Sequence, residues 1–147
     1  MNRACVGMAV LVLASGLQAG QDAAVKELKK MAGVWQATVL ELDGRALEDA
    51  EKNKAKITVV VKDNRYTIYF DDKMTSSGLL KVDPAKSPKR IEALHLDGKH
   101  KGKVQPGIYM LDDREMKIVF AEPGTKNAPK EFRTGVGEVM IHYKRVK

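Results

Sequence analysis

Three histidines, His95, His100 and His142, are the side chains of this chain best suited to bind a metal ion. A structural zinc site usually takes four protein ligands, and a catalytic zinc site takes three together with a water molecule. The three histidines are scattered along the sequence, and lysines stand on both sides of His100. We therefore expect no metal site, and interpret them as one loop histidine and two histidines on strand surfaces or rims.

Serines and paired carboxylates are the other candidates for catalysis, and their sequence contexts argue against both. Ser76, Ser77 and Ser87 stand in no Gly-x-Ser-x-Gly elbow. The pairs Asp71-Asp72 and Asp112-Asp113 fall at expected turns, where Asp side chains hydrogen-bond to nearby backbone. Adjacent residues at a strand end point to opposite faces, so neither pair forms an acid–base couple. The sequence also contains no phosphate loop, dinucleotide fingerprint or redox motif, and we expect a protein without catalytic activity or cofactor.

The first twenty residues have the composition of a secretory signal peptide. Arg3 supplies a positive charge, residues 4–17 form an apolar run, and Leu17-Gln18-Ala19 offers a small-residue cleavage site. The run is shorter than the ~20 residues that a membrane-spanning helix needs. We expect a signal peptide over residues 1–20 and a single domain over residues 21–147. That domain is predicted to be secreted or periplasmic and to have no transmembrane segment.

Cys5 is the only cysteine of the chain, and it lies within the expected signal peptide. After cleavage, the domain would have no thiol to form a disulfide, to bind a metal or to act as a nucleophile. For a secreted protein this means that packing and hydrogen bonds must supply the stability.

The chain is basic, with a formal net charge of +7, and a charge of this sign favours contact with polyanions. The densest basic stretch runs from Lys86 to Lys103, and within it Lys99, Lys101 and Lys103 are the candidate patch for an anionic polymer. Aromatic residues make up only 5% of the chain, so a stacking surface for single-stranded nucleic acid is not indicated. We expect no specific nucleic-acid partner.

The hydrophobic pattern predicts one helix followed by short strands. Ala24, Val25, Leu28 and Met31 recur at helical spacing, with Asp22 as the expected N-cap. Eight β-type runs separated by turn residues follow, with a bulge or bend expected at Gly78 in the fourth run. The expected strands cover residues 34–42, 55–62, 65–71, 74–82, 90–96, 107–111, 116–121 and 139–146.

Short connections between consecutive strands favour an all-β, antiparallel, up-and-down arrangement, and eight such strands can close into a small barrel. Such a barrel either holds one small ligand or is filled completely by its own side chains. The candidate ligand-binding residues on its interior are Val39, Tyr66, Ile68, Phe70 and Tyr109. For residues 107–111 the alternation leaves open whether Ile108 or Tyr109 points inward.

The connection over residues 122–137 is longer than an ordinary hairpin loop and contains Phe132. Two roles for Phe132 remain open from the sequence. It either anchors the loop to the core or forms part of a lid over a cavity mouth.

Gly33-Val34-Trp35, at the start of the first strand and after a short helix, resembles the Gly-x-Trp signature of lipocalin-like barrels. That resemblance implies that Trp35 lies at the closed end of the barrel and that Arg145, or Lys144, on the last strand covers it. A guanidinium over an indole face would contribute roughly 0.5–2 kcal/mol.

Further segments resemble a family of secreted lipocalin-like domains that is abundant in planctomycete bacteria. They are Val82-Asp83-Pro84, Ser87-Pro88-Lys89-Arg90-Ile91-Glu92, Gly107-Ile108-Tyr109 and the run FAEPGTKNAPKEF over residues 120–132. The resemblance covers residues 28–145 and departs from the family at Glu92, where the family has Asp, and at Ala128, where it has Arg. It implies a lipocalin-like barrel and a secreted location, and it implies no activity.

Two functions follow as hypotheses. The first is non-catalytic binding of a small, largely apolar ligand inside the barrel, which requires a cavity of at least ~300 Å³ for an ordinary small-molecule site. The alternative is a filled barrel that acts as an interaction module for anionic envelope polymers or proteins, which requires a packed interior and a contiguous basic face.

Overall fold

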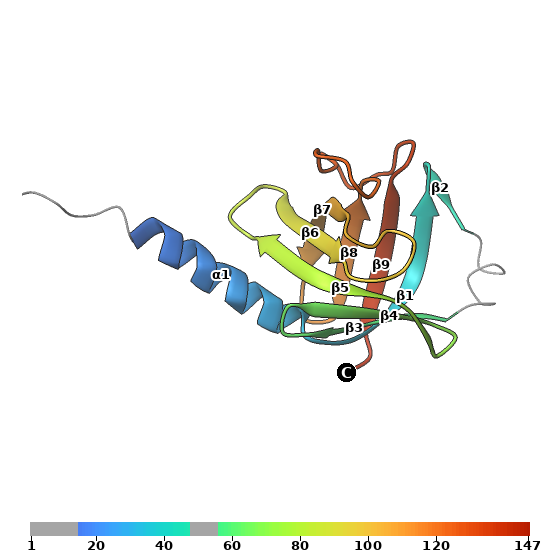
Figure 1. Cartoon of the computed structure of the whole chain (residues 1–147), viewed down its shortest axis with the longest axis horizontal. Coiled ribbons are helices and arrows are strands. Elements are labelled where there is room, and N and C mark those ends of the chain that lie inside the picture. The colour runs from blue at the N-terminus through green and yellow to red at the C-terminus, as the bar shows by residue number, and fades with distance from the viewer. Residues whose placement is uncertain (1–14, 48–55) are drawn as a thin grey trace, which may run out of the picture.

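The computed structural model describes residues 15–47 and 56–147. Within these residues the chain forms one helix and nine strands (Figure 1). They are α1 (Ser15–Met31), β1 (Gly33–Leu42), β2 (Arg45–Ala46), β3 (Ile57–Lys62), β4 (Arg65–Phe70), β5 (Lys73–Asp83), β6 (Lys89–His95), β7 (Val104–Leu111), β8 (Glu115–Phe120) and β9 (Val139–Arg145).

The strands form a closed antiparallel barrel. From β3 to β9 each strand pairs with the next along the chain, and β1 pairs with both β3 and β9. Strand β2 is a two-residue extension that pairs only with the end of β1. The barrel therefore has eight strands, β1 and β3 to β9, and the predicted all-β, up-and-down barrel with an N-terminal helix is confirmed.

Two element boundaries differ from those expected, and of the two alternatives for Gly78 the bulge is wrong. Helix α1 begins at Ser15 and not at Asp22, so Asp22 lies inside the helix and is not its N-cap. Residues 15–21 contain no proline and continue the helix upstream, and residues 15–20 of this stretch belong to the expected signal peptide. The remainder of the expected signal peptide, residues 1–14, falls outside the described residues.

Strand β7 also starts earlier than expected, at Val104, and includes Pro106. The Pro106 carbonyl accepts a hydrogen bond from the Ala121 amide at 2.9 Å, directly after the end of β8. Pro106 has no N–H to donate in return, and the Ala121 carbonyl accepts instead from the side-chain amide of Gln105 at 2.9 Å.

Gly78 is not a bulge. It pairs in regular register with Tyr66 on one side and His95 on the other, while the irregularity of the β4–β5 pair lies between Ile68 and Tyr69. The glycine is required because a Cβ atom at this position would collide with the Tyr66 side chain and the Leu94 carbonyl oxygen.

The apolar core fills most of the barrel interior, and a smaller second cluster lies at Ile108, Val119 and Met140. Tyr109 belongs to the interior cluster and Ile108 to the second one, so Tyr109 is the residue of this pair that points inward. The interior cluster consists of Met31, Trp35, Val59, Val61, Tyr66, Val82, Ile91, Ala93, Tyr109, Met116, Ile118 and Tyr143.

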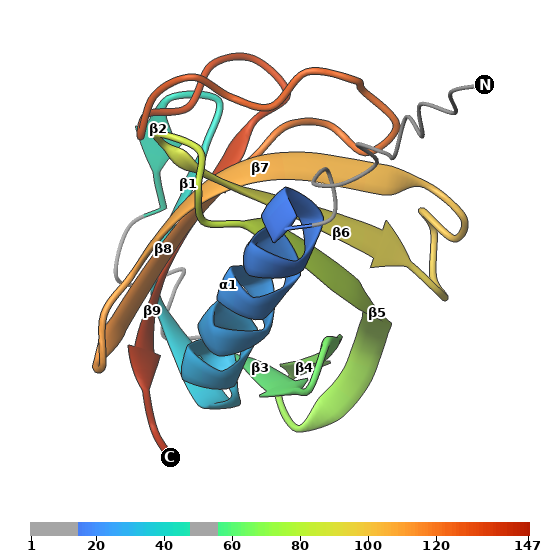
Figure 2. The same cartoon turned by 90° about the vertical axis from the view of Figure 1, so that its left-hand side faces the viewer.

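The C-terminal end of α1 covers one end of the barrel (Figure 2), and Trp35 and Arg145 hold it there. The fully buried Trp35 indole donates a hydrogen bond to the Met31 carbonyl at 2.8 Å. The Arg145 guanidinium lies 4.1 Å from the centre of the indole ring and donates to the carbonyls of Ala32 and Lys30 at 2.7 and 2.5 Å. One arginine therefore covers the indole and binds the last turn of the helix.

The first half of α1 extends away from the barrel (Figure 1). Residues 17–22 are exposed, and burial begins at Ala23 and Ala24 and becomes nearly complete at Glu27 and Met31. The contacts between helix and barrel thus lie on the C-terminal side of residue 22. Among the residues that the structure describes, no helix is both long enough and apolar enough to cross a membrane.

Candidate ligand cavity

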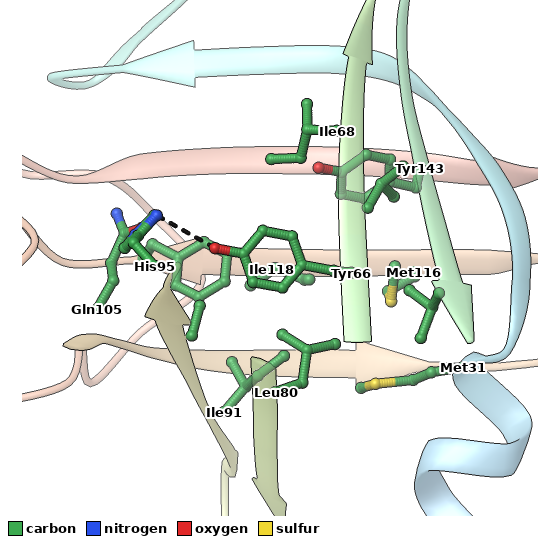
Figure 3. A pocket seen from close by; sticks show the side chains of 14 residues that line it. Met31, Tyr66, Ile68, Leu80, Ile91, His95, Gln105, Met116, Ile118 and Tyr143 are labelled. Carbon is green, nitrogen blue, oxygen red and sulfur yellow. Dashed lines mark hydrogen bonds between the residues drawn. The ribbon is translucent and has the colours of Figure 1, made fainter. Parts of the chain in front are cut away.

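A cavity of about 60 Å³ lies inside the barrel (Figure 3). Its lining is mostly aliphatic and aromatic, with polar groups from tyrosine, histidine and glutamine and no Lys, Arg, Asp or Glu among the described residues that form it. These residues are Met31, Val59, Val61, Tyr66, Ile68, Leu80, Ile91, Ala93, His95, Gln105, Met116, Ile118, Phe120 and Tyr143.

The cavity is smaller than the sequence hypothesis required. Sites for drug-sized ligands occupy roughly 300–1,000 Å³, and one molecule of liquid water occupies about 30 Å³. A volume of about 60 Å³ accommodates a molecule of only a few non-hydrogen atoms. The barrel is thus mostly filled by its own side chains, with one small space left in its interior.

A chain of hydrogen bonds borders this space. The Tyr66 hydroxyl lies 3.1 Å from His95 Nδ1, and His95 Nε2 lies 3.0 Å from Gln105 Oε1. The Gln105 amide nitrogen donates to the Ala121 carbonyl at 2.9 Å. Because that carbonyl can only accept, the Gln105 amide must direct its oxygen to His95, and His95 Nε2 must carry the proton. In the neutral imidazole Nδ1 is then the acceptor, and the Tyr66 hydroxyl donates to it.

Gly78 makes this chain possible. Tyr66, Gly78 and His95 occupy paired positions on the neighbouring strands β4, β5 and β6. A Cβ atom at position 78 would lie 2.5 Å from the Tyr66 hydroxyl and 2.1 Å from the Leu94 carbonyl oxygen. Only a residue without a side chain therefore lets the Tyr66 ring pass over β5 and reach His95.

Tyr143, on β9, contributes the second tyrosine hydroxyl of the cavity. The residue is 4% exposed, and none of the hydrogen bonds found among the described residues involves its hydroxyl. Burial alone raises its pKa far above the ordinary value. Burial also raises the pKa of Tyr66, where the neighbouring Ser76 hydroxyl opposes the change and the Asp97 carboxylate adds to it.

Two of the five predicted ligand-binding residues line the cavity, namely Tyr66 and Ile68. The other three do not. Val39 is half-buried and follows a register shift in β1, and Phe70 is 45% exposed at the end of β4. Tyr109 is buried inside the barrel, but it lies outside the cavity lining.

Tyr109 belongs instead to the junction between α1 and the barrel. The Glu27 carboxylate, almost fully buried, accepts a hydrogen bond from Lys89 Nζ at 2.7 Å, and that nitrogen lies 5.8 Å from the centre of the Tyr109 ring. The Tyr109 hydroxyl is buried without a hydrogen-bond partner among the described residues. Its pKa is strongly raised, first by burial and then by the Glu27 carboxylate.

Phe132 packs with Ala128 against the second apolar cluster, Ile108, Val119 and Met140. The tip of its loop is fixed to β1 through Thr134, whose hydroxyl donates to the Glu41 carboxylate at 2.6 Å. Phe132 is not among the residues that line the cavity. The structure thus places it as an anchor for the loop, outside the cavity, and not as a lid.

The basic stretch from Lys86 to Lys103 does not form one surface. Lys86 and Lys89 lie at the start of β6 and Lys99, Lys101 and Lys103 beyond its end, and the seven residues of this strand span roughly 20 Å at about 3.3 Å each. The candidate patch, Lys99, Lys101 and Lys103, lies exposed on the connection between β6 and β7.

Asp97 fixes the start of that connection. Its carboxylate accepts hydrogen bonds from the Ser77 hydroxyl at 2.6 Å and from the Ser77 amide at 2.7 Å, and these bonds lower its pKa. The His100 ring follows, 5.7 Å from the His95 ring, and its pKa is lowered by partial burial and then by His95 and the adjacent lysines. The lysines of the candidate patch therefore flank a histidine that lies beside His95, a middle member of the hydrogen-bonded chain.

His142 lies on β9, apart from the other two histidines, and pairs across the strands with Lys117. Burial, and then the charge of Lys117, lowers its pKa. Within the described residues, no three His, Cys, Asp or Glu side chains are grouped so that they could hold a metal ion.

The sequence reading missed His95, Gln105 and Tyr143 as cavity residues. Alternation along β6 could have found His95, because Ile91, Ala93 and His95 share one strand face. Gln105 precedes residue 107, the expected start of its strand, so the alternation of apolar residues along that strand could not assign its side chain to the barrel interior.

Comparisons of the chain with protein-family models, with curated proteins and with solved structures each found no match.

Proposed function

We propose that this protein is a non-catalytic, secreted or periplasmic barrel that binds one small, largely apolar molecule in its interior. The observation that carries the proposal is the combination of an apolar cavity with a buried tyrosine, Tyr143, whose hydroxyl has no hydrogen-bond partner among the described residues. Burying such a hydroxyl without a hydrogen bond costs roughly 1–3 kcal/mol. A bound molecule with a polar group would remove that cost.

The ligand is small. In the present shape of the barrel it has only a few non-hydrogen atoms, since the cavity measures about 60 Å³. Met31 and Met116 lie on its wall, and methionine is the most adaptable apolar side chain. A change of rotamer at either residue would admit a slightly larger molecule.

The hydrogen bonds of His95 support the proposed lack of catalysis. It is the side chain of the cavity most suited to proton transfer near neutral pH. Both of its ring nitrogens are occupied, one by Tyr66 and the other by Gln105. A general base needs a free nitrogen within reach of the substrate.

The extracytoplasmic location rests on the signal-like residues 1–20. The exposure of residues 17–22 supports it, because cleavage near Ala19 would fall in a part of α1 that is not buried against the barrel. The closed barrel, with Arg145 over Trp35, likewise supports the proposal that the chain is a relative of the lipocalin-like domains it resembles.

A second candidate function is an interaction module for anionic envelope polymers or proteins. The observation in its favour is the exposure of Lys99, Lys101 and Lys103 on a single connection, within a barrel whose interior is mostly filled.

Native mass spectrometry of protein purified gently from its own host tests the main proposal. We expect a stoichiometric additional mass that disappears on denaturation. The matched variants are Ala93→Leu, which fills the cavity, and Ala85→Leu, which adds the same atoms at an exposed position. The first should lose the additional mass and the second should keep it. A bare mass in repeated preparations, or an additional mass that survives Ala93→Leu, would contradict binding in this cavity.

A further inference from the structure

We infer that the ligand is a neutral molecule with a hydrogen-bond acceptor, and that the Tyr143 hydroxyl is the group that recognises this acceptor. The inference rests on the proposed function and deepens it by naming the class of ligand. It also assigns different roles to the two tyrosine hydroxyls of the cavity.

The charge of the ligand follows from the cavity wall. The described residues of the wall include no Lys, Arg, Asp or Glu, and the ionisable groups are His95 and two tyrosines. An ion buried without an opposite charge loses several kcal/mol of hydration or changes its protonation state. A neutral ligand meets no such penalty.

The Tyr66 hydroxyl already forms a hydrogen bond within the protein. Its proton is directed to His95 Nδ1, and the direction of this bond is fixed by a chain that ends at the Ala121 backbone carbonyl. For Tyr66 to donate to a ligand, the whole chain would have to rearrange. We therefore assign Tyr66 a structural role in the cavity.

The Tyr143 hydroxyl is available. The residue is buried, it lines the cavity, and Figure 3 shows its hydroxyl directed toward Ile68, another residue of the wall. No described residue accepts its proton. An O–H group that lines an apolar cavity and has no acceptor among the described residues gains most from a ligand oxygen or nitrogen that can take the bond. Ketones, aldehydes, ethers and alcohols of a few non-hydrogen atoms have this chemistry.

Two probes of nearly equal shape test the inference. Cyclobutanone carries a carbonyl acceptor, and methylenecyclobutane replaces it with a carbon–carbon double bond. The dissociation constant of each is measured at pH 8, above the range in which imidazole usually ionises, by two-dimensional ¹⁵N–¹H NMR titration of the purified protein. The titrations are repeated on Tyr143→Phe and on the matched variant Tyr66→Phe, and the same spectra establish that both variants are folded.

We expect Tyr143→Phe to weaken cyclobutanone binding about 3- to 10-fold and to change methylenecyclobutane binding by less than about 2-fold. Tyr66→Phe should change the binding of the two probes by the same factor. An equal loss for both probes in Tyr143→Phe, or a ketone-selective loss in Tyr66→Phe, would overturn the inference while leaving the binding function intact. If neither probe binds the wild-type protein, the proposed function fails, and the inference fails with it.

Discussion

The Tyr66 hydroxyl lies 3.1 Å from His95 Nδ1 although a complete strand, β5, runs between the strands that carry them. The contact exists because the position between them is Gly78, over which the Tyr66 ring passes. The polar side of the cavity thus depends on the absence of a side chain.

Gly78→Ala is therefore expected to be strongly destabilising. The new Cβ would lie 2.1 Å from a backbone oxygen, which cannot move aside as a flexible side chain could. Overpacking of this kind costs about 1–3 kcal/mol, and we expect the upper end of that range in urea denaturation. Gly135→Ala is the matched control, because its Cβ would meet only the Glu138 side chain at an ordinary 3.6 Å. Equal stability of the two variants would contradict the packing of Tyr66 over Gly78.

The pair Trp35 and Arg145 should prove essential for the stability of the barrel. Trp35→Ala removes a fully buried ring and is expected to cost roughly 3–5 kcal/mol in the free energy of unfolding. Arg145→Ala leaves the carbonyls of Lys30 and Ala32 without their donor, and we expect about 2–3 kcal/mol. A loss below ~1 kcal/mol for Trp35→Ala would disagree with its place in the core.

Stability should fall at alkaline pH. The pKa values of Tyr66, Tyr109 and Tyr143 are raised above the ordinary 10.0, in each case mainly by burial. Above pH 10 the unfolded chain loses tyrosine protons that the folded chain still holds, so the unfolded state binds fewer protons and the free energy of unfolding decreases as pH rises. The contribution of these three tyrosines to the free energy of unfolding is fully present below pH 10.

Denaturation curves between pH 8 and pH 11 measure this decrease. Tyr143→Phe removes one of the three groups and should make the decrease less steep. A slope above pH 10 that is unchanged in this variant would contradict the burial of its hydroxyl.

If the candidate patch binds anionic polymers, retention on a sulfated-polysaccharide resin should fall steeply as salt increases, because exposed charges are screened. Reversing Lys99, Lys101 and Lys103 to Glu should abolish retention. Reversing Lys86, Lys62 and Lys81, which are also exposed but lie elsewhere, changes the net charge equally and should have a smaller effect. Equal losses for both triple variants would show that net charge, and not the patch, governs retention.

The architecture could be predicted from the sequence because alternation and turn residues act locally. Asp43-Gly44, Asp63-Asn64 and Asp112-Asp113 each mark a connection between consecutive strands, and each expected strand has a counterpart in the structure. The start of α1 could not be predicted, since apolar residues before Asp22 suit both a signal peptide and a helix.

The cavity depends on relationships across strands, which a local pattern does not contain. The alternation of Tyr66, Ile68 and Phe70 placed them on one face, but the exposure of Phe70 at the end of its strand is set by the shape of the whole barrel. Likewise, the role of His95 becomes visible only when the register places Gly78 between it and Tyr66.

The closure of the barrel by β1 and β9 also has a consequence for folding. Arg145 binds the carbonyl of Ala32, 113 positions earlier in the chain, and β1 has β9 as one of its two long neighbours. Contacts between distant parts of a chain slow folding, because the entropy of a long loop is lost before the contact forms. One edge of strand β1 stays unpaired until β9 has been synthesised, so the barrel cannot close before then.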